Sequence, residues 1–133
     1  MSRILIDTDW IIDVLHGQVA AVEKLNELEP RGLAVSLISY GELYQGAYYA
    51  RNRDEALAGL REFLVGKDLL PTTVSVMERF GIVRGQLTRQ LRQQIGDMDV
   101  IIAATALTYD LTLMTRNLRD FQHIPDLGLY EPA

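Results

Sequence analysis

Short runs of aliphatic residues alternate along this chain with segments of helical periodicity, and this alternation limits the folds that it can adopt. Residues 3–6, 33–39 and 111–115 have the aliphatic composition of buried strands. A weaker strand is predicted at 69–74, because Pro71 interrupts it. Alternating strands and helices are typical of a parallel sheet covered on both faces. We therefore predict an α/β chain with three layers: helices, sheet and helices.

The segments between these strands have apolar residues three or four positions apart, which predicts helices. Gly17, Pro30 and Gly66 are expected to mark helix ends. The predicted helices cover residues 8–16, 18–29, 40–50, 53–66, 75–94 and 99–110, and a loop or helix start follows at 116–121. We find no repeat, low-complexity stretch or linker, so we expect a single domain over residues 1–133.

The composition excludes several classes of protein. The absence of cysteine excludes disulfides and thiolate metal sites. No apolar run approaches the ~18 residues of a membrane span, and the first residues lack the order of a signal peptide, so we expect a cytoplasmic protein. The net charge of −5 argues against a general nucleic-acid binder. A bound divalent cation would, however, reverse the local sign of charge.

Acidic side chains fall where the predicted strands end. Asp7 ends the first strand, Glu42 comes three residues after the second, and Asp99 begins a helix, while Asn117 and Asp120 follow the last strand. In open parallel sheets ligands sit outside the carboxyl ends of the strands. Carboxylates gathered there repel one another unless a cation neutralises them, and hard oxygen ligands favour Mg²⁺ or Mn²⁺. Such an ion can polarise a phosphate and generate hydroxide from water.

Each acid also has a purely structural interpretation. Ser39 and Glu42 match the capping box that closes a helix N-terminus. Asp97 and Asp99 lie in the first turn of a predicted helix, where the backbone stabilises carboxylates, and Asp9 is a candidate helix cap. The metal interpretation is favoured by joint placement, because three of the acids belong to the same edge of the inferred sheet. These three are Asp7, Glu42 and Asp99.

Two further patterns suggest binding surfaces. Arg116 and Arg119 flank Asn117 at the acidic edge and can hold a phosphate backbone. Tyr40, Tyr44 and Tyr48 recur every four residues, which indicates either a packing stripe or an interface. The chain has no nucleophile elbow and no glycine-rich phosphate loop.

Four segments together resemble the PIN-domain family, and within it the VapC-type ribonuclease toxins of bacterial toxin–antitoxin pairs. ILIDTDWIIDVL resembles the opening strand of the family, and SLISYGELYQGA resembles the segment with a Glu in the next helix. GDMDVIIAATAL resembles the third acidic motif, and LTLMTRNLRDFQHIPDLGLYE resembles the closing strand and tail. The resemblance covers nearly the whole chain and implies a PIN-like α/β/α fold with a short central parallel sheet of four to five strands.

The resemblance also implies roles for individual residues. Asp7, Asp99 and Glu42 take the principal acidic positions and would bind Mg²⁺ or Mn²⁺. A fourth acid in many relatives falls at Asn117, so this chain departs from the fully acidic pattern, and Asp120 one turn later can supply the charge. The resemblance therefore implies catalytic roles for Asp7, Glu42, Asp99, Asn117 and Asp120, and substrate contacts from Thr8, Thr115, Arg116 and Arg119.

The activity implied by the resemblance is metal-dependent endoribonuclease activity. Metal-activated water would hydrolyse an RNA phosphodiester and leave a 5′-phosphate and a 3′-hydroxyl. The implied partners are a second copy in a homodimer, a higher toxin–antitoxin assembly, and a VapB-like antitoxin that lays a segment in a groove. The tyrosine stripe and Trp10 are the candidate surfaces for these partners.

Several other classes of protein remain open on the sequence. A haloacid-dehalogenase-type phosphatase also begins with a strand ending in D-x-D, although Ile11 stands where that class normally has Thr or Val. A receiver-type domain needs a late lysine, and the last lysine here is Lys67. A PIN-fold nuclease of RNA processing shares the chemistry of a toxin. A non-catalytic binding module is favoured by the Asn at position 117.

Overall fold

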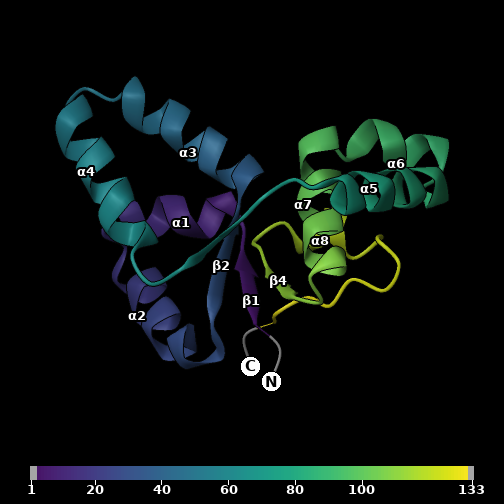
Figure 1. The fold of residues 1–133 in the computed structure, drawn as a ribbon, viewed down its shortest axis with the longest axis horizontal. Coiled ribbons are helices and arrows are strands. Elements are labelled where there is room, and N and C mark those ends of the chain that lie inside the picture. Colours follow the sequence, from purple (N-terminus) through teal and green to yellow (C-terminus); the bar gives the residue numbers. More distant parts are fainter. Residues whose placement is uncertain (1–2, 132–133) are drawn as a thin grey trace.

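The central feature of the computed structural model, which describes residues 3–131, is a four-stranded parallel sheet with helices on both faces (Figure 1). The strands are β1 (Ile4–Ile6), β2 (Leu33–Ser36), β3 (Asp68–Leu70) and β4 (Thr112–Met114). Their order across the sheet is β3-β2-β1-β4. A single bridge from Leu113 to Leu129 adds the C-terminal segment to the β4 edge. The predicted fold class and the predicted four to five strands are confirmed.

The helices follow the predicted sequence order. They are α1 (Thr8–Leu15), α2 (Val19–Leu28), the short 3₁₀ helix η1 (Glu29–Arg31), α3 (Leu37–Tyr48), α4 (Arg53–Leu64), α5 (Val74–Gln86), α6 (Arg89–Gln94), α7 (Asp97–Thr108) and α8 (Leu118–Phe121). Gly17 follows α1 with a φ of 75°, a conformation that favours glycine, so the predicted helix end is confirmed there. Among the described residues, none of these helices is long and apolar enough to cross a membrane.

Several predicted elements are wrong in their extent. The strand predicted over 69–74 is the shorter β3, and α5 already begins at Val74. The single helix predicted over 75–94 is two helices, because the Thr88 side chain accepts a hydrogen bond from the Leu91 N–H and begins α6, while Leu87 is extended. The strand predicted over 33–39 ends at Ser36. The Ser36 hydroxyl accepts from the Ser39 N–H at 3.1 Å, so α3 begins at Leu37.

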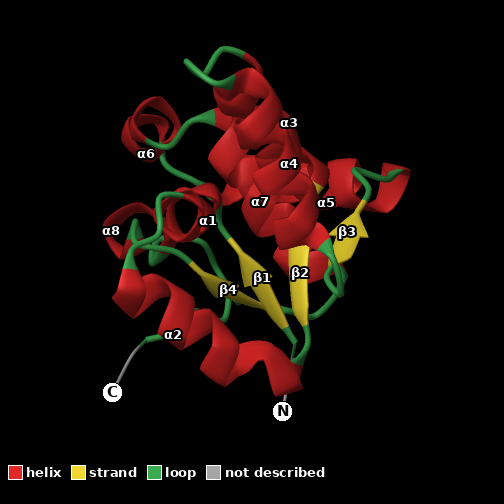
Figure 2. Cartoon of the chain, turned by 90° about the vertical axis from the view of Figure 1, so that its left-hand side faces the viewer, coloured by secondary structure: helices red, strands yellow, loops and turns green. Residues whose placement is uncertain are grey.

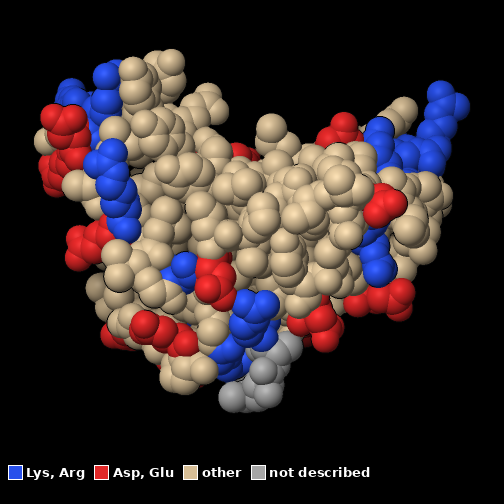
Figure 3. Space-filling model, viewed as in Figure 1, with Lys and Arg blue, Asp and Glu red and all other residues tan. Residues whose placement is uncertain are grey.

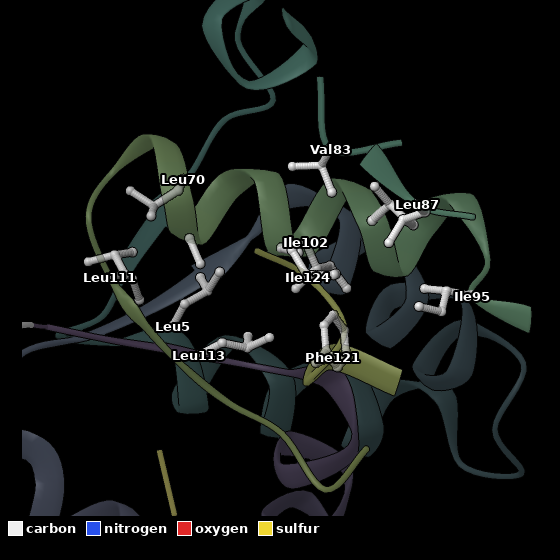
Figure 4. Close-up of a cluster of buried hydrophobic side chains, with 14 residues drawn as sticks. Leu5, Leu70, Val83, Leu87, Ile95, Ile102, Leu111, Leu113, Phe121 and Ile124 are labelled. Atoms are coloured by element: carbon white, nitrogen blue, oxygen red, sulfur yellow. The ribbon is translucent and has the colours of Figure 1, made fainter. Parts of the chain in front are cut away.

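Side chains of β1 alternate between two hydrophobic cores. Leu5 points into the core under α5 and α7, which Figure 4 shows together with Leu113 and Phe121. Ile4 and Ile6 point into the opposite core, under helices α1 to α4. All three β1 residues are completely buried, which explains why the strand is aliphatic throughout instead of alternating between apolar and polar residues.

The topology brings the carboxyl ends of β1, β2 and β4 together. Because β1 lies between β2 and β4, Asp7 directly after β1 is flanked by the segments that follow both neighbouring strands. Helices α1 to α4 and helices α5 to α8 extend from the sheet on either side (Figure 1), and Figure 2 shows β4, β1 and β2 side by side. The surface is hollowed between the part formed by α3 and α4 and the part formed by α5 to α7 (Figure 3).

We expect the substitution Phe121→Ala to lower the free energy of unfolding by about 3–5 kcal/mol, because it removes a completely buried ring and leaves a cavity. Urea unfolding followed by circular dichroism measures this change. The matched control is Ile82→Ala on α5, where the side chain is 57% exposed and the expected change is within about 0.5 kcal/mol. Equal effects of the two substitutions would contradict the described core.

Candidate active site

Asp7 is held rigidly between the end of β1 and the start of α1. Its Oδ1 accepts from the Thr8 N–H at 2.8 Å, and its Oδ2 accepts from the Thr115 hydroxyl at 2.7 Å. Its own N–H donates to the Met114 carbonyl at 2.9 Å, which continues the pairing of β1 with β4. The residue is only 6% exposed. The local sequence thus places one buried carboxyl at a defined position, oriented by both neighbouring segments.

Burial raises the pKa of Asp7 from its ordinary value of 3.8 to about 7, and the charges of Asp9 and Asp99 act in the same direction. The hydrogen bonds from Thr115 and Thr8 lower the pKa but do not offset these effects. Burial also raises the pKa of Asp9 and that of Asp99. A cluster of carboxyls that resist ionisation gains most from a neighbouring cation.

Glu42 and Asp99 face this carboxyl from two other elements. Glu42 lies in the second turn of α3, and its Oε1 accepts from the Thr8 hydroxyl at 2.8 Å. The capping-box interpretation of Glu42 is wrong, since Ser36 caps α3. Asp99 lies in the first turn of α7, where the negative charge of Glu42 contributes to its raised pKa. The structure therefore brings together three predicted acids, from the N-cap of α1, from α3 and from α7.

Asp97 is in the same helical turn as Asp99 but faces a different neighbour. Its Oδ1 forms an ion pair with Arg84 of α5 at 2.6 Å. Side chains two positions apart on a helix point in different directions. Asp97 is therefore a link between α5 and α7, whereas Asp99 is the acid that belongs to the cluster.

The segment after β4 contributes hydroxyl and amide groups. The Asn117 N–H donates to the Thr115 oxygen at 3.0 Å, and the Asn117 side-chain amide donates to Asp120 at 3.0 Å. Gln94 of α6 donates to the other oxygen of Asp120 at 2.6 Å. These two amides lower the pKa of Asp120, with Gln94 as the larger cause. Asn117 thus orients Asp120, which keeps an ionised carboxylate near the cluster.

The structure adds two residues that were not predicted for the site. Asp9, interpreted from the sequence as a cap, accepts from the Arg116 N–H at 3.1 Å, and its charge raises the pKa of Asp7. The D-x-D spacing was the available signal for Asp9. Gln94, which holds Asp120, had no signal in the sequence because the two residues are 26 positions apart.

The arginines predicted to contact substrate differ in their surroundings. Both side chains are exposed, but Arg116 also pairs with Asp13 of α1 at 2.8 Å and lies over the Trp10 ring, while Arg119 lies on α8. Trp10 is only 8% exposed, so it is wrong as a candidate partner surface. Tyr44 and Tyr48 are exposed along α3 with their rings 6.2 Å apart, and they remain available to a partner.

The donor atoms of the cluster fit a hard divalent cation. Carboxylate oxygens from Asp7, Asp99 and Glu42 are the donors that Mg²⁺ and Mn²⁺ prefer. Burial, and to a smaller extent the neighbouring carboxylates, raise the pKa values of Asp7 and Asp99, and a bound cation would favour their ionised forms. Within residues 3–131, no group of three or more Asp, Glu, His or Cys side chains is arranged closely enough to enclose an ion. The side chains would have to converge further to form a ligand shell.

The fold agrees with that of known proteins to which this chain is similar. The profile of the PIN domain matches residues 4–127, so the chain belongs to the PIN-domain family. Ribonuclease VapC19 of Mycobacterium tuberculosis is 36% identical over 92% of this chain and 95% of its own length. This similarity places the chain among the VapC-type members of the family.

Two solved structures share the fold along nearly the whole chain. A DNA-bound VapBC from Salmonella typhimurium superimposes with a TM-score of 0.85 and 26% identity, covering 98% of each chain. A toxin–antitoxin complex from Klebsiella pneumoniae gives a TM-score of 0.74 and 29% identity, covering 96% of this chain and 98% of that one.

The pKa of Asp7 predicts the pH dependence of stability in the metal-free protein. The folded-state pKa of about 7 lies above that of the unfolded chain. The protonated Asp7 carboxyl therefore makes its full contribution to the free energy of unfolding below pH ~4. This contribution is lost as the pH rises toward ~7. We expect the free energy of unfolding to fall by roughly 2–4 kcal/mol over this range. Urea unfolding across the pH range measures it.

The control is Asp7→Asn, which removes the titrating group but keeps a similar shape. Its stability should change much less with pH, with a residual slope from Asp9 and Asp99, whose pKa values are also raised. A variant whose slope equals that of the wild type would show that Asp7 is not the group responsible.

Proposed function

We propose that this chain is a VapC-type endoribonuclease toxin that hydrolyses RNA phosphodiester bonds with Mg²⁺ or Mn²⁺. The observation that carries the proposal is the convergence of Asp7, Glu42 and Asp99 at one sheet edge, where burial and mutual repulsion raise the pKa of Asp7 to about 7. Perturbed carboxyls in such a position are typical of functional sites. The VapC-type relatives support the choice of RNA as substrate.

Each residue has a distinct role in the proposed reaction. Asp7 and Asp99 would hold the cation, and Glu42 would help to position it or the attacking water. The bound cation supplies Lewis-acid polarisation of the phosphate and lowers the pKa of water. Thr115 orients Asp7, and Asn117 orients Asp120, which adds negative charge beside the cluster.

The RNA backbone requires basic side chains, although the chain carries a net charge of −5. We assign a phosphate contact to Arg119, which is exposed on α8 next to the cluster. Thr8 is predicted to lie close to the substrate, because its hydroxyl contacts Glu42. Basic side chains gather at both upper ends of the face in Figure 3, on either side of the hollow. Binding through such local patches should be moderate in affinity and sensitive to salt.

A VapB-like antitoxin is the proposed inhibitor. A groove of about 770 Å³ lies between α1, α3 and α4 and reaches Glu42 of the acidic cluster. Its lining is mostly apolar, with Ile12, Leu15 and Ala47, and also contains Glu55 and Glu62. A partner segment with apolar and basic residues would complement this groove and obstruct the site. The exposed tyrosine rings of α3 are the candidate surface for the proposed homodimer.

The remaining alternatives differ in what they predict. Membership of the PIN-domain family removes the dehalogenase-type phosphatase and the receiver-type domain. A nuclease of RNA processing would show the same metal-dependent cleavage but would have no antitoxin reading frame beside its gene. A non-catalytic PIN module would show no cleavage.

We expect purified protein to cleave RNA in Mg²⁺ or Mn²⁺ and to be inactive in EDTA. Asp7→Asn and Asp99→Asn should each reduce the cleavage rate more than roughly 100-fold. A loss of roughly 100-fold is the most that is expected when only a residue supporting a metal ligand is changed. The assay is end mapping of total RNA, which should find 5′-phosphate and 3′-hydroxyl ends.

The matched control is Asp97→Asn, which changes an acid of the same helical turn that pairs with Arg84 instead of joining the cluster. It should keep its activity within a few-fold of the wild type. Identical cleavage by wild type and Asp7→Asn, purified in the same way, would assign the activity to a contaminant and overturn the proposal.

We expect Ile12→Arg to abolish co-purification with the antitoxin encoded beside the gene, because it places a bulky charge in the apolar groove. Co-expression followed by affinity purification measures this. Ile82→Arg, on an exposed part of α5 outside the groove lining, is the control and should keep the complex. Retention of the partner by both variants would place the antitoxin elsewhere.

A further inference from the structure

Arg116 directly follows Thr115, and its side chain is engaged by helix α1 and the residue that precedes α2. Its Nε donates to Asp13 at 2.8 Å, and its terminal nitrogen Nη2 donates to Gln18 at 3.3 Å. The centre of the guanidinium lies 3.8 Å from the centroid of the Trp10 ring. Stacking on an aromatic face while the edges form hydrogen bonds uses the planar geometry that distinguishes Arg from Lys.

The backbone of Arg116 is held by the same helix. Its N–H donates to Asp9 Oδ2 at 3.1 Å, and the other oxygen of Asp9 accepts from the Trp10 N–H at 2.7 Å. Main chain and side chain of Arg116 are thus both fixed to the first two turns of α1. The loop between β4 and α8 cannot shift without breaking these contacts.

The residue on each side of Arg116 belongs to the acidic site. The Thr115 hydroxyl donates to Asp7 at 2.7 Å and accepts from the Asn117 N–H at 3.0 Å. The positions of Thr115 and Asn117 therefore depend on the position of the loop that Arg116 fastens to α1.

We infer that Arg116 is a positioning residue, which fastens the β4–α8 loop to α1 so that Thr115 orients Asp7, and that it is not a ligand of the RNA phosphate. The Arg116 side chain is 43% exposed. Its Nε and Nη2, however, already donate to Asp13 and Gln18 and its plane stacks on Trp10, so turning the guanidinium toward a phosphate would break contacts that hold the loop. This inference revises the substrate contact expected from the sequence. It rests on the proposed nuclease function for its kinetic test.

The kinetic test compares Arg116→Ala with Arg119→Ala on one short RNA substrate. We expect Arg116→Ala to lower kcat by about 10-fold or more with little change in KM, as is usual when support of a metal-site residue is lost. We expect Arg119→Ala to raise KM and to reduce the slope of log affinity against log salt by about 0.7, as loss of one phosphate contact to a single strand does. Arg116→Lys should not rescue, because an ammonium cannot replace the stacked planar group.

The change in Mn²⁺ affinity is a second measurement, and its direction distinguishes a simple charge effect from loss of the fastened loop. Removing a positive charge beside a cluster of acids should strengthen Mn²⁺ binding if charge alone matters. Loss of the fastened loop should weaken it. We expect titration calorimetry to show about 10-fold weaker Mn²⁺ binding to Arg116→Ala.

Hydrogen exchange of the metal-free protein tests the inference independently of nuclease activity. The Asn117 N–H donates to Thr115, so its exchange should be at least about 10-fold faster in Arg116→Ala if the loop loosens. Asp13→Ala, which removes only the outer partner of the guanidinium, should change exchange and kcat in the same direction. It serves as the test if Arg116→Ala does not fold.

Three results would overturn the inference: an unchanged Asn117 exchange rate, faster exchange with unchanged kcat and cation affinity, or a rise in KM with a lower salt slope for Arg116→Ala. If the wild type neither cleaves RNA nor binds Mn²⁺, the proposed function fails. The exchange rates then still decide whether Arg116 holds the loop.

Discussion

The hydrogen bond from the Thr115 hydroxyl to Asp7 joins two residues that are 108 positions apart, and the acidic site is built around it. It can form because β1 and β4 are neighbours in register, with the Asp7 N–H bonded to the Met114 carbonyl. A hydroxyl has one proton to donate. Thr115 donates it to Asp7 at 2.7 Å, while Asp9 lies farther away at 3.4 Å. One carboxyl oxygen of Asp7 is thereby fixed, and the Thr8 N–H fixes the other.

The buried carboxyls of the site lower the stability of the fold, and the two hydrophobic cores offset this cost. Asp7, Asp9 and Asp99 all have raised pKa values, so their ionised forms are less stable in the folded chain than in water. Folded proteins retain such unfavourable groups mainly where function requires them. The aliphatic β1, buried on both faces, provides the rigid base on which these carboxyls are kept close together.

Much of this arrangement was predictable from local patterns. The ends of parallel strands meet at one edge, so Asp7 and the acids after the other strands could be grouped before any contact was known. The sequence favoured Asp99 for the cluster, but the role of Asp97 could not be predicted, because it depends on where Arg84 of α5 lies. The support of Asp120 by Gln94 was likewise invisible, since it depends on how α6 packs against α8.

The predicted helix over 75–94 was wrong because apolar periodicity was given more weight than a helix cap within the segment. Thr88 begins a new helix through its side-chain cap, yet the apolar spacing continues on both sides and suggests one helix.

Arg116 was expected at the phosphate because charged residues beside an acidic edge usually face solvent. Its stacking on Trp10 and its ion pair with Asp13 depend on the position of α1 relative to β4, which no local pattern encodes.

The position of β1 in the sheet determines when the site can exist during synthesis. Strand β1 lies between β2 and β4, and β4 is the last strand within residues 3–131. A nascent chain can pair β1 with β2 early, but β1 keeps an open edge until residues 112–114 are available. Asp7 therefore has no Thr115 beside it until the chain has been synthesised as far as residue 115. A chain that stalls before this point carries the acids of α1, α3 and α7 without the segment that orders them.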